Sequence, residues 1–128
     1  MKTSIAEIAD RCSILLHKIR NCNDIDNKTS ITFEFREYME EIYYFSKAYP
    51  EIFIYLIELY NINGEIWALE SDIRKGHEKE LGIDEVGRRS ILIRDKNKQR
   101  ISIKNRITEH FDIGHKEIKI NHASDEQQ

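Results

Sequence analysis

The sequence predicts an all-α protein, a bundle of four helices in a single domain. Proline occurs once and glycine five times in 128 residues, too few for the many tight turns of an all-β fold. Apolar residues recur at spacings of three and four, as on the buried face of a helix. With 40% hydrophobic residues, a chain of this length can bury one core.

Residues 1–120 are expected to form the single helical domain, followed by a polar tail over residues 121–128. The first residues carry charges where a signal peptide has an apolar core, and no apolar run approaches the roughly 18 residues of a membrane-spanning helix. The two cysteines, Cys12 and Cys22, match no zinc spacing and indicate thiols in a reducing compartment. We therefore expect a soluble, cytoplasmic protein with no membrane partner.

The first two helices are predicted from capping and apolar spacing. Ser4 and Glu7 have the spacing of a capping box, and an amphipathic stripe follows, so the first helix is expected over residues 4–20. Residues 21–28 are polar and turn-forming, which indicates a loop. A second helix is expected over residues 32–48, with a short strand as the alternative for its first turn.

The third helix is expected over residues 50–75, because Pro50 ends the preceding helix and suits the first turn of a new one. Its apolar seam contains two polar residues, Asn63 and Glu70, which need partners. A second apolar stripe, which includes Trp67, adjoins the seam. Two apolar faces are what a central helix of a bundle would have.

The fourth helix is expected over residues 85–111, after a polar connection at 76–84 with glycine and aspartate at helix-cap positions. A short connection predicts that the third and fourth helices form a long antiparallel hairpin. In that hairpin Asn63 faces Asn97. The polar residues of the two helices then meet in one layer.

The polar layer has two interpretations. In the structural one, Asn63 bonds Asn97 across the core while Glu70 pairs with Arg94 or Arg89, which fixes the register of the helices.

In the functional interpretation, the same layer lines a cleft between the third and fourth helices, where arginines form bidentate hydrogen bonds with a phosphate or carboxylate group. The ligand would be a phosphorylated small molecule such as a nucleotide or nucleotide sugar. The residues of the ligand-binding site or buried polar layer are Asn63, Trp67, Glu70, Arg74, Arg94, Asn97, Arg100 and Lys104.

The net charge of −3 hides an asymmetry between segments. Residues 30–75 hold nine acidic and four basic side chains, whereas residues 86–107 hold eight basic and one acidic. The basic charges spread around the helix and have no interleaved aromatic residue, and an acidic helix can neutralise them. We therefore do not expect nucleic-acid binding.

No catalytic constellation stands out. Four carboxylates faintly resemble the magnesium-binding cluster of all-α nucleotide pyrophosphohydrolases: Glu40, Glu41, Glu70 and Asp72. However, Glu70 and Asp72 lie about 200° apart around their helix. No histidine pair has i, i+4 spacing, and there is no Gly-rich phosphate loop or nucleophile elbow. We expect no catalytic residue, no metal and no cofactor.

The chain carries the pattern N-x3-W-x2-E-x-D-x-R followed by N-x2-R-x3-K, within NINGEIWALESDIRK and NKQRISIK. This pattern resembles that of an uncharacterised family of small bacterial helical proteins, a domain of unknown function. The opening AEIADRCSILLHKI is similar to the family's first helix, with Asp10 and Lys18 in register. The other matching positions are Asn63, Trp67, Glu70, Asp72, Arg74, Asn97, Arg100, Lys104 and, more loosely, Arg94.

The resemblance implies no activity. Family members occur beside genes for cell-surface polysaccharides, which implies a context and not a chemistry. The sequence therefore predicts a non-enzymatic binding or interaction module with a polar layer in its core. Its expected partner is a second copy, as a homodimer, or another protein; the alternative is a pocket for an anionic small molecule.

Overall fold

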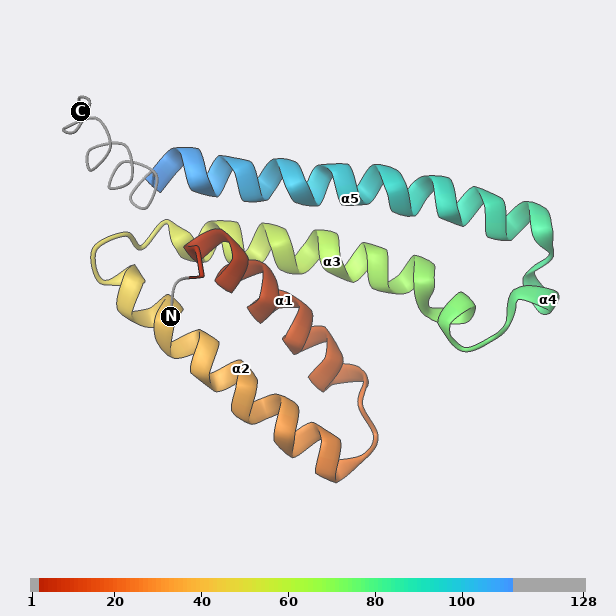
Figure 1. The fold of residues 1–128 in the computed structure, drawn as a ribbon, viewed down its shortest axis with the longest axis horizontal. Coiled ribbons are helices and arrows are strands. Elements are labelled where there is room, and N and C mark those ends of the chain that lie inside the picture. Colours follow the sequence, from red (N-terminus) through yellow and green to blue (C-terminus); the bar gives the residue numbers. More distant parts are fainter. Residues whose placement is uncertain (1–2, 112–128) are drawn as a thin grey trace.

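The computed structural model describes residues 3–111, and this part of the chain is helical with no strand (Figure 1). The predicted all-α class is confirmed. The predicted tail over residues 121–128, and the end of the predicted domain at residue 120, lie outside the described residues.

Helix α1 spans Ile5–Asn21. The predicted N-cap is present, because the hydroxyl of Ser4 accepts a hydrogen bond of 3.2 Å from the backbone N–H of Glu7.

Helix α2 spans Ile25–Ser46, so it begins seven residues before the predicted start at residue 32. Asp24 caps it by accepting a 3.0 Å hydrogen bond from the backbone N–H of Asp26. The prediction of a loop over residues 21–28 was therefore wrong in its second half. The polar residues that suggested a loop are the exposed first turn of α2.

Helix α3 spans Ile52–Arg74 and helix α5 spans Ile83–Phe111, both close to their predicted bounds. Between them lies α4, a single turn over Glu78–Leu81 that was not predicted. Gly76 and Gly82 flank this turn with φ angles of 80° and 82°, a conformation that glycine adopts without strain. The described residues thus form five helices and not the four predicted.

The helices form two pairs (Figure 1). Helix α5 lies alongside α3 and runs in the opposite direction, with α4 at the connection. Helices α1 and α2 form the second pair, and α1 packs against α2, α3 and α5, whereas α2 barely contacts α3. Helices α1 and α3 therefore each contact all the other long helices.

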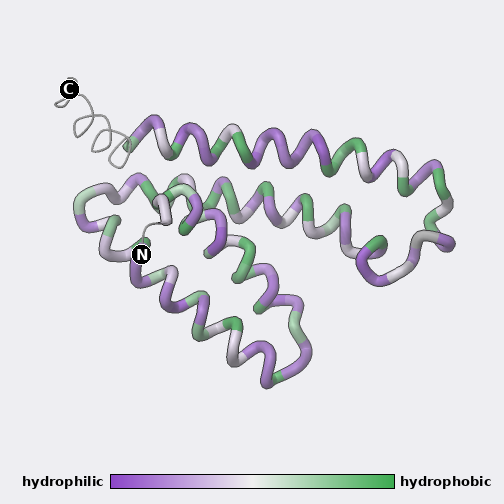
Figure 2. The backbone as a smooth tube through the Cα atoms, in the orientation of Figure 1, coloured by the Kyte–Doolittle hydropathy of each residue, from purple (hydrophilic) through white to green (hydrophobic). Residues whose placement is uncertain are grey.

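The core follows from this arrangement. The largest fully buried side chains are Ile42, Ile52, Leu59 and Ile107, one or more from each of α2, α3 and α5, and they pack with the apolar side chains of α1. Figure 2 shows hydrophobic residues spaced along α1 and α3 and a mainly hydrophilic α5.

The second apolar stripe of α3 is not buried as the central-helix interpretation requires. Ile57 is 61% exposed, and the neighbouring Ile54 is 60% exposed. Helix α3 does pack against α1 and α5, as a central helix would, but α1 has the most buried residues, and the second stripe of α3 stays partly exposed. None of the helices in residues 3–111 combines the length and the apolar character needed to cross a bilayer.

Candidate binding site

Asp10 is the centre of the polar contacts among α1, α3 and α5. Its residue surface is only 2% exposed. One carboxylate oxygen accepts a 3.0 Å hydrogen bond from Nδ2 of Asn63 on α3, and the other accepts a 2.7 Å bond from Nη2 of Arg100 on α5. Nε of Arg100 also lies 3.0 and 3.1 Å from the two oxygens. One carboxylate therefore ties three helices together.

Asn63 does not pair with Asn97 as the structural interpretation expected. Its Nδ2 donates to Asp10 and, at 2.6 Å, to the hydroxyl of Ser13, while that hydroxyl donates to the backbone carbonyl of Asp10 at 2.8 Å. The expectation failed because it considered only the two hairpin helices, whereas the partners of Asn63 come from α1. Asn97 instead accepts a 3.2 Å bond from Nη1 of Arg100.

Lys104 joins this network one turn after Arg100. Its Nζ lies 2.7 Å from a carboxylate oxygen of Glu7 and 3.8 Å from Asp10. Two anions of α1 therefore face two cations of α5, and their four charges cancel.

The charges also set the protonation of the buried carboxylate. Burial alone would raise the pKa of Asp10, but hydrogen bonds from Arg100 and Asn63 and the charges of Arg100 and Lys104 outweigh it. The pKa of Asp10 therefore lies below its ordinary value, so the group is ionised at neutral pH. The hydrogen bond to Asp10 in turn raises the pKa of Arg100.

A pocket of about 270 Å³ opens beside the network, between α1, α3 and α5. Three of its side chains are cationic and one is anionic. The lining residues are Ile14, His17, Lys18, Asn63, Ile66, Trp67, Glu70, Arg74, Asn97 and Arg100.

His17 forms part of the wall and is held on several sides. Its Nε2 lies 2.7 Å from the backbone carbonyl oxygen of Tyr60, and its ring stacks on that tyrosine with centroids 4.0 Å apart. A Cβ added at Gly64 would lie 2.8 Å from Cε1 of His17. Glycine at this position therefore allows the imidazole to approach the backbone of α3.

Trp67, Glu70 and Arg74 line the pocket from the second half of α3. The guanidinium of Arg74 lies over the Trp67 ring, 4.2 Å from its centroid, and donates a 3.0 Å hydrogen bond to Glu70. Glu70 therefore pairs within its own helix. The structural interpretation expected it to pair with Arg94 or Arg89, and that expectation was wrong.

The two arginines have other partners. Arg89 pairs with Glu85 and Asp72, and Arg94 is 66% exposed beside Asp95. Because one turn separates Glu70 from Arg74, the local pair forms without any contribution from the register of the hairpin.

Six of the eight predicted site residues line this one pocket: Asn63, Trp67, Glu70, Arg74, Asn97 and Arg100. Lys104 belongs to the adjoining network. Arg94 belongs to neither, because its side chain turns to solvent.

The site residues that α1 contributes were not predicted, because the predicted set came only from the third and fourth helices. Asp10, Ser13 and His17 lie at spacings of three and four on one face of α1, next to its apolar stripe. A polar row on the edge of a buried helix was the signal that could have identified them.

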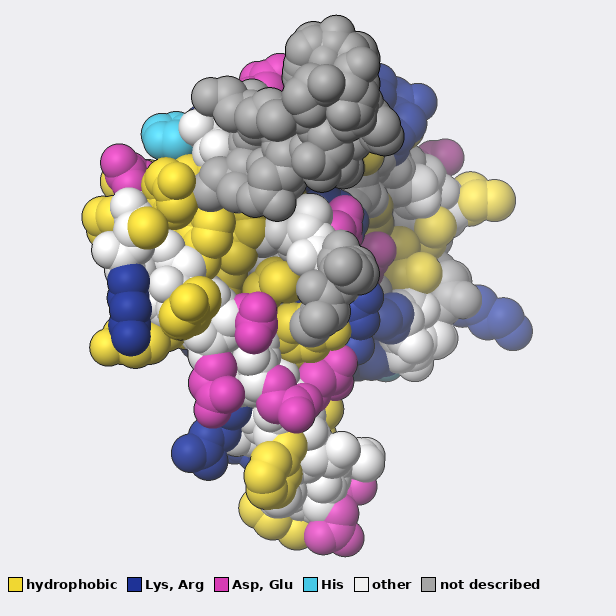
Figure 3. All heavy atoms as spheres, turned by 60° about the vertical axis from the view of Figure 1, so that its left-hand side comes forward, with side chains coloured by type: hydrophobic (Ala, Val, Ile, Leu, Met, Phe, Trp, Pro, Cys, Tyr) yellow, Lys and Arg dark blue, Asp and Glu magenta, His cyan; other side chains and the backbone are white. Residues whose placement is uncertain are grey.

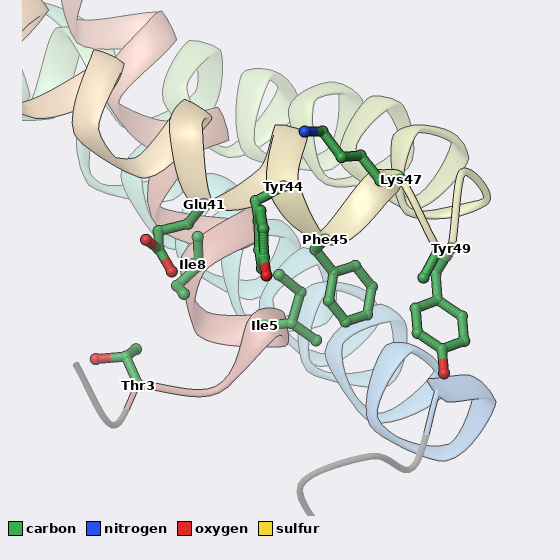
Figure 4. Close-up of a pocket in the computed structure, with 9 residues that line it drawn as sticks. Thr3, Ile5, Ile8, Glu41, Tyr44, Phe45, Lys47 and Tyr49 are labelled. Carbon is green, nitrogen blue, oxygen red and sulfur yellow. The ribbon is translucent and has the colours of Figure 1, made fainter.

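A larger hollow of about 570 Å³ lies at the other end of α1. Figure 4 shows Tyr44 and Phe45 of α2 reaching toward Ile5 and Ile8 there, with Glu41 and Lys47 at its margin. Its lining is mainly apolar, and no group of polar side chains converges in it. The smaller pocket, where cations and amides converge, is therefore the better candidate site.

Among residues 3–111, no three His, Cys, Asp or Glu side chains come together as metal ligands would. The carboxylates Glu40, Glu41, Glu70 and Asp72 thus do not form the cluster that a magnesium-dependent hydrolase of this type needs.

Comparisons with protein-family models, curated proteins and solved structures give no match to this chain. The resemblance to an uncharacterised bacterial family stays a prediction based on the sequence pattern. Most positions of that pattern lie in the network or the pocket: Asp10, Lys18, Asn63, Trp67, Glu70, Arg74, Asn97, Arg100 and Lys104.

Proposed function

We propose that the protein is a helical binding module that holds a small anionic molecule in the pocket between α1, α3 and α5. The observation that carries the proposal is the lining of this pocket, which has three cationic side chains against one carboxylate. The fold proposed with it is a bundle in which the α3–α5 hairpin forms one wall and α1 the other. The hydrogen bonds that Asp10 accepts from both helices of the hairpin support it.

The balance of charge favours an anion. Arg100 is neutralised by Asp10, and Arg74 by Glu70. Lys18 has no ion-pair partner within the described residues, so its charge is left over at the pocket. A cation without a partner gains more from an incoming anion than a cation that a neighbouring carboxylate already neutralises.

Arg100 adds free donors to this charge. A guanidinium has five N–H groups, and three are used, two on Asp10 and one on Asn97. The remaining N–H groups on Nη1 and Nη2 suit the oxygens of a phosphate or carboxylate. Because the network fixes the guanidinium, little side-chain entropy is lost on binding.

The size of the pocket limits the ligand. Its volume of about 270 Å³ lies just below the ~300–1,000 Å³ typical of small-molecule sites. A phosphate ester or carboxylate with a few carbon atoms fits this space better than a whole nucleotide sugar.

A thermal-shift series tests the proposal. Inorganic phosphate, glycerol 3-phosphate, a nucleoside monophosphate and a nucleotide sugar would be compared at equal ionic strength. We expect glycerol 3-phosphate to raise Tm most, because it matches both the charge and the volume.

Two lysine variants distinguish binding in the pocket from general attraction to cations. Lys18→Gln removes the unpaired charge at the pocket, and Lys98→Gln removes an exposed charge of α5 outside it. We expect the Tm shift to fall in the first variant only. Equal shifts in both variants, or no shift with any of the four compounds, would refute the proposal.

We also propose self-association through an apolar face of α3. A groove of about 260 Å³ between α1, α2 and α3 is lined by Phe35, Met39, Leu56 and Ile57, among others, and is almost wholly apolar. Ile54 protrudes from the same side of α3, one turn away. An isologous dimer needs a self-complementary patch, and this face offers a protruding side chain next to a groove.

In Figure 3, hydrophobic side chains also gather on the surface at the end of the molecule where α2 passes into α3. The test is solution mass at two concentrations, for the parent and for Ile57→Glu. We expect a concentration-dependent dimer that the variant abolishes. A monomer at high micromolar concentration would exclude self-association.

A further inference from the structure

We propose that the ligand of this pocket carries a hydroxyl or amino group beside its anionic group, and that this group donates a hydrogen bond to Nδ1 of His17. The inference rests on the proposed function and narrows its ligand to hydroxylated anions, such as polyol phosphates and hydroxycarboxylates.

The tautomer of His17 follows from its partner. Nε2 lies 2.7 Å from the carbonyl oxygen of Tyr60, and a carbonyl can only accept. Nε2 therefore carries the hydrogen. In the neutral ring, Nδ1 then has a lone pair and acts as an acceptor.

Within the described part of the chain, this acceptor has no hydrogen-bond donor. His17 is only 7% exposed, and no hydrogen bond reaches Nδ1 from any residue in the range 3–111. Buried acceptors are satisfied in most proteins, and an unsatisfied one is costly. A ligand that brings a donor to this nitrogen removes that cost.

Of the two ring nitrogens of His17, Nδ1 is the one farther from Gly64. The Nε2–Cε1 edge of the imidazole lies against Gly64 and the carbonyl of Tyr60, with Nδ1 farther away, 3.8 Å from the Cβ position. His17 also lines the pocket, together with the cationic Lys18 and Arg100. A single small molecule can thus meet cations with its anionic group and Nδ1 with a hydroxyl.

The experiment compares two phosphate monoesters of equal charge by calorimetry at pH 8. Glycerol 3-phosphate has hydroxyl groups, and propyl phosphate has none. We expect glycerol 3-phosphate to bind about three- to tenfold more tightly, the contribution of one added hydrogen bond.

His17→Gln tests whether the imidazole causes this difference. Glutamine keeps an amide N–H near the position of Nε2 for the Tyr60 carbonyl and removes the Nδ1 acceptor. The preference should fall to within about twofold in this variant. His77→Gln, a histidine outside the pocket, should keep the parent preference.

A measurement on the parent does not depend on the folding of any variant. In the ¹⁵N spectrum of the imidazole, the signal of unprotonated Nδ1 should move upfield with glycerol 3-phosphate and not with propyl phosphate. If both esters bind equally and Nδ1 does not move, the inference is wrong while the proposed function stands. If neither ester binds, both are wrong.

Discussion

Replacing Asp10 by asparagine tests the network that positions Arg100. The substitution keeps the shape of the side chain but removes the charge, and it places an NH₂ group where a carboxylate oxygen accepts bonds from Arg100. Asn63 keeps its bond to Ser13, so the loss is concentrated on the ion pair.

The magnitude follows from burial. Breaking one side of a fully buried ion pair costs ~3–5 kcal/mol. The side chain of Arg100 is 28% exposed and can be partly rehydrated, so we expect the lower end, ~3 kcal/mol. Unfolding entropy of ~2.1 cal/mol/K per residue over 128 residues gives ~0.27 kcal/mol/K, and hence a fall in Tm of ~11 °C.

The pH dependence gives a second test of the same ion pair. The folded-state pKa of Asp10 is lowered, so its contribution to stability is fully present above the unfolded-state pKa of ~3.9. This contribution is lost as the pH falls through the folded-state value. The difference in stability between parent and Asp10→Asn should therefore be constant from pH 7 to about 5 and shrink below about pH 4.

Urea unfolding followed by far-UV circular dichroism measures both quantities. Asp95→Asn is the matched control, because Asp95 is half exposed and its loss should cost ~0.5 kcal/mol or less. A loss below ~1 kcal/mol for Asp10→Asn at pH 7, or a loss that does not change at low pH, would refute this account of the network.

Two further predictions concern packing. Gly64→Ala should destabilise the protein by ~1–2 kcal/mol in urea unfolding, because the added Cβ meets the ring of His17. Gly87→Ala has open space around it and should stabilise α5 by ~0.5–1 kcal/mol. Equal effects of the two substitutions would contradict the close approach of His17 to Gly64. Burial raises the pKa of Cys12 to about 12. A thiol reagent at pH 8 should therefore label only Cys22 rapidly in the folded protein. Rapid labelling of both cysteines would show that α1 is not buried as described.

The sequence predicted the helices well where their signals are local. The N-cap at Ser4 and the helix break at Pro50 both depend on neighbouring residues. The starts of α1 and α3 therefore lie close to where they were expected. The start of α2 was missed because a polar first helical turn and a polar loop have the same composition. The side chain of Asp24, which caps the helix, is the only local difference.

The partners of the site residues were harder to predict because they come from a third helix. Facing α3 against α5 brought polar residues of these two helices together, but it could not show that α1 packs against both of them. Asn63 therefore received the wrong partner, although its need for a partner was correct. The position of α1 depends on its own apolar and polar faces together. A comparison of α3 with α5 alone contains no information about these faces.

The fluorescence of Trp67 tests the central claim most directly. Trp67 is the only tryptophan in the chain, and it lines the pocket beneath Arg74. Titration with glycerol 3-phosphate should produce a saturable change in emission. The apparent Kd should rise about two- to fivefold in Lys18→Gln, the loss expected for one exposed charge, and stay unchanged in Lys98→Gln. A linear change without saturation, or identical curves for the two variants, would contradict an anion site in this pocket.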